Sequence, residues 1–373
     1  MRAFFAVLLV SLLAGGCASA PAYIIGVDGT SVTAAEVPLA TPVDIFIATT
    51  RARSDDNRVL YSGERSDTVS FAKVTVSVPP DHKTGHIERS RSLPPDPRKD
   101  FVVLNPQEFS GAAAFTAEID EALVQRAEPD QTILLFIHGY NNDMASAILR
   151  TAQFVHDSDF RGIPVVFSWA SRGKTIDYVY DLNSALHARD GIIEASRALS
   201  ETRAKGFDIL AHSMGNLLTI EAIRQSAIMG DYARGSRVRH VILAAPDIDI
   251  DLFRRQLAHI PLADPPIYVL TSGDDRALAL SRRLAGGVSR VGIADPDELA
   301  ELGVTVIDLS KADNQGSSDH TKFANSPDVV KLIGAGLNTT GSAQSPRRLR
   351  DRSIRTIAPG AVLIPARADR VQP

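Results

Sequence analysis

The chain has 373 residues, of which 44% are hydrophobic, and a formal net charge of −4 at pH 7. This length can bury one large hydrophobic core or two modest ones. The slightly acidic balance lacks the basic excess that is typical of nucleic-acid-binding domains, so we expect no nucleic-acid partner. A single cysteine, Cys17, excludes an internal disulfide.

The first residues have the pattern of an export signal. Arg2 precedes an apolar run, residues 4–13, which is too short to span a bilayer as a mature helix but has the length of a signal h-region. We therefore expect the chain to be exported to the cell envelope.

Two cleavage sites compete at the end of this signal. Residues 18–20 (ASA) have the small-x-small form of a signal peptidase site, but cleavage there would place Pro21 directly after the cut. Residues 13–17 (LAGGC) resemble a bacterial lipobox, although Ala14 stands where that motif more often has Leu. The alternative to a lipobox is a cysteine that is discarded with the signal peptide.

The lipobox resemblance implies a signal peptide over residues 1–17 that ends at a lipidated Cys17. Acyl chains such as palmitate would then hold the protein in a membrane. Ala18 after the cysteine suggests sorting to the outer membrane, with the protein facing the periplasm.

Residues 18–40 are small and polar with little periodicity, which is typical of a tether. Strands are predicted over 43–49 and over 69–78, where apolar and polar residues alternate, and together they predict an antiparallel edge at the start of a sheet. Residues 82–98 are charged or turn-forming, so we expect a loop in which His82 and His86 are solvated.

From residue 133 onward, apolar runs of strand length alternate with helical periodicity. Strands are predicted at 133–137, 164–167, 207–211, 238–245, 267–270 and 304–307, with helices between them. This alternation predicts one α/β domain over residues 41–336, in which helices cover both faces of a mostly parallel sheet. The remainder, residues 337–373, is rich in Gly, Ser, Pro and Arg and predicts a basic, disordered tail, with contact to anionic lipid or cell-wall polymer as the alternative.

A candidate nucleophile lies where one predicted strand meets a helix. The sequence Phe207 to Asn216 (FDILAHSMGN) ends an apolar run in small-x-Ser-x-Gly, and helical spacing resumes at once. A sharp strand-to-helix turn needs small residues on both sides of the serine, here Ala211 and Gly215. This pattern indicates that Ser213 is a catalytic serine, whereas an ordinary turn is the simpler interpretation.

The base and acid of a serine triad should follow the nucleophile in the order acid, then histidine. His240 and His259 fall within predicted secondary structure, which favours structural roles, whereas His320 lies in a polar loop after the last strand. His320 is therefore the candidate base.

Three aspartates are candidates for the acid. Asp275 and Asp274 close the penultimate strand, and Asp247 follows the strand before it. We prefer Asp275, then Asp274, then Asp247. Asp275 could cap the following helix and still present a carboxylate to a histidine.

The oxyanion hole should combine the amide of Met214 with one from the loop after an earlier strand. Residues 136–143 (FIHGYNND) have this form: Gly139 permits an exposed turn, and Tyr140 would donate its backbone N–H. We expect His138 to be a packed, hydrogen-bonded support of this loop. Asn142 or Asp143 can cap the next helix.

Several of these motifs together resemble a known family. They are FIHGYNN, VFSWASRG at 166–173, AHSMGN, LAAPDID at 243–249 and SDHxxF at 318–323. In this order they are similar to an uncharacterised bacterial group of esterase/lipase-like α/β-hydrolases, over about residues 42–335. The resemblance implies the α/β-hydrolase fold and a Ser213, Asp275, His320 triad, but no substrate.

From these residues we expect a serine esterase that acts through an acyl-enzyme on a small-molecule or lipid ester. The alternatives are an envelope acyltransferase and a catalytically silent lipoprotein that binds or scaffolds. The sequence shows no His, Cys and Asp cluster at metal-ligand spacing, so we expect neither a metal nor an organic cofactor. Trp169, Tyr178 and Tyr180 are candidates to line an acyl pocket, with packing as the alternative.

Overall fold

The structure is a computed structural model that describes residues 37–90, 93–232, 237–262, 265–314, 318–338 and 356–367. The predicted signal peptide, Cys17 and nearly all of the predicted tether lie outside these residues. Within the described ranges, every helix is too short or too polar to cross a bilayer.

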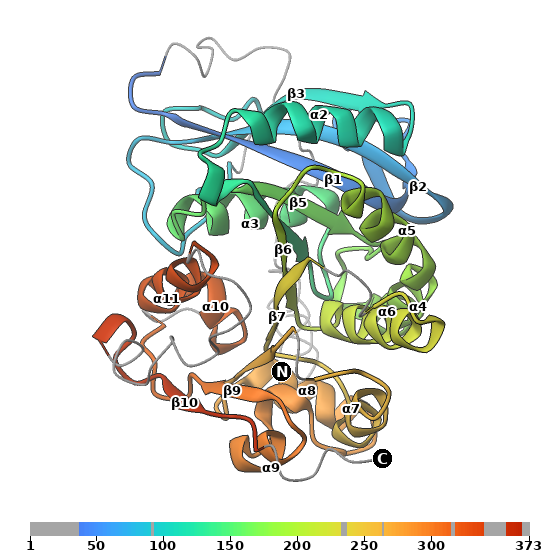
Figure 1. Cartoon of the computed structure of the whole chain (residues 1–373). Coiled ribbons are helices and arrows are strands. Elements are labelled where there is room, and N and C mark those ends of the chain that lie inside the picture. Colours follow the sequence, from blue (N-terminus) through green and yellow to red (C-terminus); the bar gives the residue numbers. More distant parts are fainter. Residues whose placement is uncertain are drawn as a thin grey trace, which may run out of the picture.

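A single mixed sheet runs through the molecule (Figure 1), with its strands in the order β10-β9-β8-β7-β6-β4-β5-β1-β2-β3. The strands that pair in parallel are β1 (Thr41–Arg53), β4 (Thr132–Ile137), β5 (Ile163–Ser168), β6 (Gly206–His212), β7 (Val238–Ala244), β8 (Ile267–Thr271) and β9 (Thr305–Asp308). The strands that pair antiparallel at the two edges are β2 (Tyr61–Val78), β3 (Val102–Phe109) and β10 (Val362–Ile364).

Helices cover both faces of this sheet. The helices that pack into one hydrophobic cluster are α2 (Ala112–Val124), α4 (Tyr178–His187), α5 (Arg189–Ser200), α6 (Gly215–Met229) and α7 (Ile250–Leu257). The helices that pack into the cluster on the opposite face are α3 (Met144–Asp157), α10 (Lys322–Asn325) and α11 (Pro327–Leu337). Two further helices, α8 (Arg276–Leu284) and α9 (Pro296–Glu301), follow β8 and precede β9, and α9 adds Leu299 to the first cluster.

The central strands are apolar throughout because both of their faces are buried. In β4, Ile133 and Leu135 belong to one cluster, whereas Leu134 and Phe136 belong to the other. Successive side chains of a strand point to opposite faces, so a continuous apolar run is what a fully covered parallel strand requires. The predicted α/β fold, with a mostly parallel sheet, an antiparallel N-terminal edge and helices on both faces, is confirmed.

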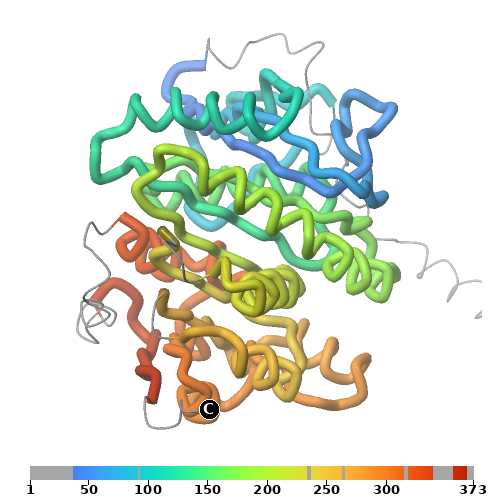
Figure 2. Tube along the Cα trace, turned by 45° about the vertical axis from the view of Figure 1, so that its right-hand side comes forward, coloured from blue at the N-terminus to red at the C-terminus, as the bar shows by residue number. Residues whose placement is uncertain are grey.

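Two strands near the N-terminus, β2 and β3, differ most from the sequence prediction. β2 begins at Tyr61, eight residues before the predicted start, and β3 was not predicted. The segment of β3 contains Pro106 and exposed polar residues, which suit an edge strand and weaken its apolar pattern. Figure 2 shows these N-terminal strands at one end of the molecule and the C-terminal elements at the other.

The prediction of a tail without structure is wrong for residues 356–367. Here β10 pairs antiparallel with β9, and Ala358 and Ala361 are buried in the hydrophobic cluster that also contains α11. Arg367 holds the end of this segment by ion pairs to Asp297 and Glu301 of α9. The other residues of the predicted tail beyond Asn338 lie outside the described part of the chain.

Candidate active site

Ser213 lies in a strained turn between β6 and α6. Its φ is +53°, in the left-handed region, which costs a residue other than glycine roughly 1–3 kcal/mol. The amide of Ser213 donates to the carbonyl of Ala244 (3.0 Å), and the carbonyl of Ser213 accepts from Asp247 N (3.2 Å). Hydrogen bonds to the turn after β7 therefore hold the serine in this conformation.

The loops after the two neighbouring strands are strained in the same way. Asn141 follows β4 with φ +59°, and Ala245 follows β7 with φ +45°. Because β4, β6 and β7 are adjacent and parallel, these residues and Ser213 lie at the same edge of the sheet. Left-handed non-glycine residues concentrated at one sheet edge are characteristic of functional sites.

Two glycines bring the loop after β4 against the turn that carries Ser213. A Cβ on Gly139 would lie 2.7 Å from Cβ of Ser213, and a Cβ on Gly215 would lie 2.4 Å from the carbonyl oxygen of His138. Both distances are shorter than atoms tolerate, so only glycine permits this approach. The structure thus brings together the serine and the loop in which the oxyanion donor was predicted.

The two predicted oxyanion donors lie on this loop and on the turn. Met214 immediately precedes α6, whose N-terminus favours negative charge. Among the described residues, the backbone amides of Met214 and Tyr140 donate to no other group. Both amides therefore have their hydrogen-bonding capacity free.

A buried arginine donates hydrogen bonds to the loop after β4 and to neighbouring groups. Arg51, at the end of β1, is 1% exposed and donates to the carbonyls of Asn142 (2.7 Å) and Ser171 (2.7 Å) and to Oγ of Ser168 (2.8 Å). Burial lowers the pKa of Arg51 to about 10, so it stays charged at neutral pH. Sequence reasoning missed this residue, which lies some ninety positions before the loop.

His138 packs beside this arginine. Its ring stacks on Trp169 with centroids 4.9 Å apart, Nδ1 donates to the carbonyl of Gly139 (2.9 Å), and Nε2 faces Oγ of Ser168 (3.1 Å). Burial and the nearby charge of Arg51 lower the pKa of His138 to about 3, so the ring is neutral. These contacts place His138 under the loop as a packed residue.

A buried carboxylate, Asp181, also holds the loop after β4. Asp181 of α4 accepts from the amides of Asn141 (3.1 Å) and Arg172 (3.0 Å) and from Oγ of Ser171 (2.5 Å). Burial raises its pKa.

The helix after this loop begins with a predicted cap. Asp143 caps α3 by accepting from the amide of Ser146 (2.7 Å), and Asp143 was one of the two residues predicted for this position.

His320 and Asp275 are in direct contact. Nδ1 of His320 lies 2.7 Å from Oδ2 of Asp275, while Oδ1 accepts from the amides of Ala277 (2.9 Å) and Leu278 (3.0 Å) at the start of α8. One buried carboxylate thus caps a helix and orients the imidazole. Because Nδ1 faces the carboxylate, it carries the proton and leaves Nε2 as the free acceptor.

His320 is hydrogen-bonded to His212, the residue before Ser213. Nε2 of His212 donates to the carbonyl of His320 (3.0 Å), and the two rings lie 4.7 Å apart. Burial, together with the neighbouring His320, holds the pKa of His212 well below its usual value, so His212 is neutral. The backbone of the candidate base is therefore held by the residue that precedes Ser213.

The structure places Asp274 and Asp247 away from His320. Asp274 accepts from Nζ of Lys322 (3.0 Å) and Oγ of Ser272 (2.5 Å). Asp247 accepts from Ser281 (2.6 Å) and Tyr178 (3.1 Å) and pairs with the buried Arg290 (3.3 Å). Of the three candidate acids, the structure brings only Asp275 to the histidine.

Lys322 is a second buried cation that sequence reasoning missed. Its side chain is 2% exposed. It joins the segment that carries His320 to the loop after β8, which carries Asp274 and Asp275. Besides Asp274, it donates to Oγ of Ser272 (3.0 Å) and the carbonyl of Leu309 (3.2 Å). These bonds fix the segment that carries His320 relative to the one that carries Asp275.

The three aromatic candidates for an acyl pocket lie in three different environments. Trp169 is fully buried and donates Nε1 to the carbonyl of His138 (2.8 Å), so it packs rather than lines a pocket. Tyr180 lies under the guanidinium of Arg172, 3.7 Å from the ring centroid. Tyr178 contacts the ring of Tyr140, 5.2 Å between centroids, and burial and Asp247 raise its pKa to about 12.

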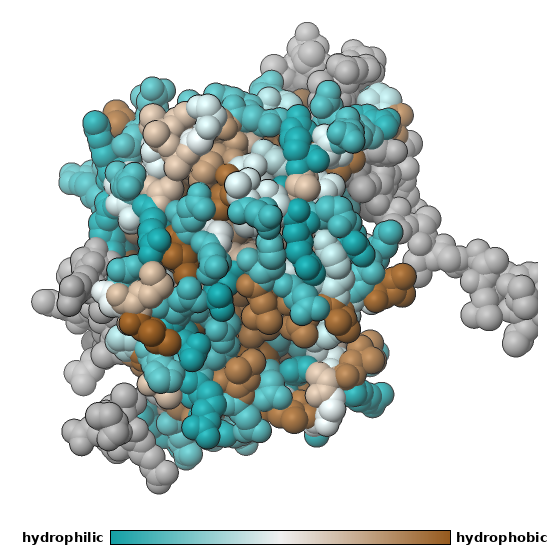
Figure 3. Space-filling view, turned by 90° about the vertical axis from the view of Figure 1, so that its right-hand side faces the viewer, coloured by the Kyte–Doolittle hydropathy of each residue, from teal (hydrophilic) through white to brown (hydrophobic). Residues whose placement is uncertain are grey.

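Exposed apolar side chains surround Tyr178. Ile176 and Val179 are 88% and 68% exposed, and the Tyr178 hydroxyl contacts Ser281 of α8, which also carries the exposed Leu280. Figure 3 shows the side of the molecule on which α4 and α7 lie, and hydrophobic side chains gather over part of it. An apolar surface therefore adjoins the loop of Tyr140.

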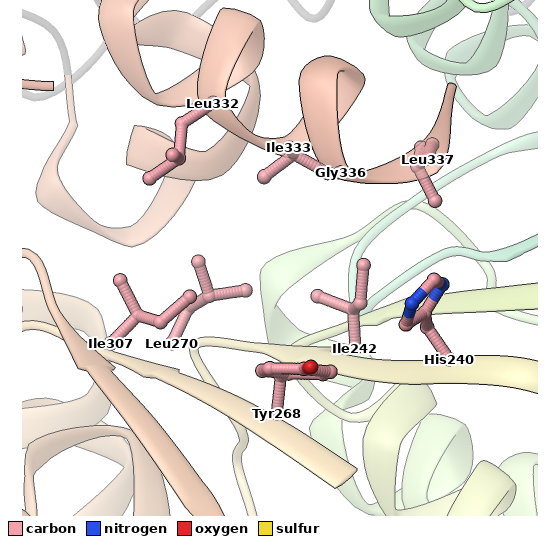
Figure 4. Close-up of a pocket in the computed structure, with 9 residues that line it drawn as sticks. All are labelled: His240, Ile242, Tyr268, Leu270, Ile307, Leu332, Ile333, Gly336 and Leu337. Carbon is pink, nitrogen blue, oxygen red and sulfur yellow. The ribbon is translucent and has the colours of Figure 1, made fainter. Parts of the chain in front are cut away.

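A separate apolar cavity lies between the sheet and α11 (Figure 4). Side chains of β7, β8 and β9 face those of α11 across it: His240, Ile242, Tyr268, Leu270, Ile307, Leu332, Ile333, Gly336 and Leu337. None of these residues belongs to the site at Ser213. His240 bonds the buried Asp208 through Nδ1 (2.8 Å), which fits the structural role expected for it.

A comparison with solved structures finds several of low similarity. Similar solved structures include an esterase from Pyrobaculum calidifontis, with 11% identity over 82% of this chain and 87% of that chain and a TM-score of 0.37. Others are a Rhizomucor miehei esterase (12% identity, 82% and 86% covered, TM-score 0.35) and Aspergillus fumigatus lipase B (13%, 67% and 62%, 0.38). At these identities and TM-scores we draw no conclusion from the similarity. A search of curated proteins found no match.

A family model gives a direct assignment. The model described as alpha/beta hydrolase of unknown function (DUF900) matches residues 112–336, which is more than half of the chain and includes Ser213, Asp275 and His320. The resemblance stated from the sequence motifs is confirmed. The chain belongs to this family of alpha/beta hydrolases of unknown function.

Proposed function

We propose that the chain is a serine hydrolase that cleaves carboxylic esters through an acyl-enzyme, with Ser213 as nucleophile, His320 as base and Asp275 as the orienting acid. The observation that carries this proposal is the 2.7 Å contact between His320 Nδ1 and Asp275 Oδ2, on a histidine whose backbone is hydrogen-bonded to His212, the residue before the left-handed Ser213. A histidine oriented by a carboxylate beside a strained serine is the arrangement that acyl transfer requires.

In the proposed reaction, His320 Nε2 takes the proton of Ser213 Oγ as the oxygen attacks the ester carbonyl. The amides of Tyr140 and Met214 donate to the resulting oxyanion, each contributing roughly 3 kcal/mol to the barrier reduction. The tetrahedral intermediate expels the alcohol, which receives the proton from His320. Water then attacks the acyl-enzyme and gives a proton to His320. The second tetrahedral intermediate releases the acid as His320 returns that proton to Ser213 Oγ.

The apolar surface beside Tyr178 supports an ester with an apolar acyl group. Ile176 and Val179 expose large side chains near the loop of the proposed oxyanion donor. Exposed apolar area at the edge of a site favours an apolar substrate group, since contact removes both surfaces from water.

The proposal is tested with a fluorophosphonate probe and a series of p-nitrophenyl esters of increasing acyl length. We expect the wild type to be labelled once, at Ser213, and to hydrolyse at least one ester. Ser213→Ala should lose labelling and should lower kcat by about 10⁴-fold or more. Asp275→Asn should keep the fold and lower kcat strongly, because the imidazole tautomer is lost.

Ser196→Ala is the matched control, because Ser196 is an exposed serine on α5, and it should label and turn over as the wild type does. Absence of labelling in the folded wild type, or equal labelling of Ser213→Ala, would contradict the proposal. Product analysis with added alcohols or amines separates hydrolysis from acyl transfer.

We further propose, from the sequence, that Cys17 carries acyl chains that anchor the protein to the outer membrane, with the enzyme facing the periplasm. The lipobox-like residues 13–17 support this localisation. Cys17→Ser should release the protein from the membrane fraction on cell fractionation. Unchanged retention in that fraction would contradict the anchor.

A further inference from the structure

Three potential metal ligands meet at the far end of α3 from the candidate active site. His82 comes from the loop after β2, and His156 and Asp157 end α3. One ligand atom from each lies within 4.8 Å of the other two. The expectation that His82 is solvated is wrong, since its side chain is 4% exposed, whereas His86 in the same loop is exposed.

One oxygen of Asp157 is shared by both histidines. Oδ1 lies 2.7 Å from Nε2 of His82 and 3.2 Å from Nδ1 of His156. The other oxygen, Oδ2, is already satisfied by the amide of Gly85 (2.6 Å) and by Gln153 (2.6 Å). These bonds fix the carboxylate and direct Oδ1 at the two imidazoles.

A second carboxylate orients His82. Oε2 of Glu88 lies 2.7 Å from Nδ1 of His82, and Oε1 accepts from the amide of Lys83 (3.1 Å). The ring also packs edge-on against Phe101 and His156, with centroids 5.2 and 5.1 Å away. A carboxylate on the remote nitrogen of a histidine is the usual outer partner of a metal-binding imidazole, because it fixes the tautomer and ring orientation.

We propose that His82 Nε2, His156 Nδ1 and Asp157 Oδ1 form a zinc site, with Glu88 orienting His82. Two imidazole nitrogens and one carboxylate oxygen are a donor set that Zn²⁺ binds tetrahedrally, with water as the fourth ligand. Bond lengths of 2.0–2.2 Å place tetrahedral ligand atoms about 3.3 Å apart. Oδ1 of Asp157 already lies 3.2 Å from Nδ1 of His156, and its distance of 2.7 Å to Nε2 of His82 would have to increase. The His156 side chain is 31% exposed, which gives an ion access from solvent.

The site would hold the loop after β2 against α3. It lies at the last turn of α3, whereas Asp143, beside the proposed oxyanion loop, caps the first turn. A helix of this length separates its ends by about 20 Å. The ion is therefore too far from Ser213 to take part in the reaction there, and binding it should raise thermal stability.

The test is titration of the full chain with Zn²⁺ by calorimetry, after treatment with a chelator, together with Co²⁺ as a spectroscopic probe. We expect one equivalent of Zn²⁺ to bind, tetrahedral Co²⁺ absorption that Zn²⁺ abolishes, and a rise of a few degrees in Tm. His82→Ala and His156→Ala should weaken binding by about 100-fold or more, and Glu88→Gln by roughly 10-fold.

Two controls locate the ion. His86→Ala removes an exposed histidine of the same loop and should bind Zn²⁺ as the wild type does. His320→Ala should also keep the full equivalent, because His320 belongs to the other site. If His82→Ala does not fold, the test uses the Zn²⁺ affinities of His156→Ala, at the partly exposed ligand, and of Glu88→Gln, which removes the carboxylate that orients His82. Stoichiometric binding that survives His156→Ala or is lost in His320→Ala, or no binding to the wild type, would overturn the proposal.

Discussion

Two buried cations hold the candidate active site from opposite sides, and they differ in what they bind. Arg51 donates to backbone carbonyls and a serine hydroxyl of the loops after β4 and β5. Lys322 joins the loops after β8 and β9 but also pairs with Asp274, whose side chain is half exposed. Loss of Arg51 should therefore cost more stability than loss of Lys322, because its carbonyl partners cannot turn to water as the half-exposed Asp274 can.

Arg51→Met should have the largest effect. It leaves several buried carbonyls without a donor, so we expect a loss of about 3 kcal/mol in the free energy of unfolding. The loop of Tyr140 should also shift, lowering the rate of fluorophosphonate labelling by about 100-fold. Chemical denaturation and labelling kinetics measure the two effects, and a variant with wild-type labelling would show that Arg51 does not position this loop.

Gly139→Ala tests the same loop without removing a charge. The new methyl group would approach Cβ of Ser213, so the loop or the serine must move. We expect labelling to slow by roughly 30- to 100-fold, with a smaller loss of stability than in Arg51→Met. Equal labelling of this variant and the wild type would argue against close contact between the loop and the nucleophile.

Lys322→Met should have an intermediate effect on the opposite side. Asp274 can turn to water, so we expect a stability loss of about 2 kcal/mol and a 10- to 30-fold slower labelling rate, as His320 loses its fixed position. The ratio of kcat to KM effects on an ester series separates this from a folding defect, since a positioning role lowers kcat more than it raises KM. Lys322→Arg should restore part of the rate.

Asp274→Asn should have the smallest effect, with labelling within about threefold of the wild type, because the residue is half exposed. Burial opposes ionisation of Asp274, but hydrogen bonds from Ser272 and Lys322 outweigh it and lower the pKa below 3.8. The contribution of Asp274 to stability is therefore present above pH 3.8 and is lost as the pH falls through the folded pKa. Denaturation curves of wild type and variant should converge in acid, and a constant difference across that range would contradict the ion pair.

The residues that we propose as reacting groups could be chosen from the sequence because each lies in a local pattern. Ser213 interrupts a strand and begins a helix, and His320 follows the last strand of the alternating series. Chain order then limits the acid to a few aspartates. The choice of Asp275 depends on a contact across 45 residues, which only the structure displays.

The supporting groups could not be predicted in the same way. Arg51 meets Asn142 across 91 residues, and His82 meets Asp157 across 75. Nothing in the neighbourhood of either residue indicates its partner. A charged residue that continues the buried face of β1 is the one signal that Arg51 offers, since an inward cation must find acceptors.

The strand β10 has a consequence for solubility. Without it, β9 would present a row of unpaired backbone amides and carbonyls at the border of the sheet, and such borders recruit strands from other molecules. The short segment over 356–367 covers that border and is fastened to α9 by Arg367. Removing the chain after residue 338 should therefore leave the proposed catalytic groups in place but cause the protein to self-associate through the exposed edge of β9.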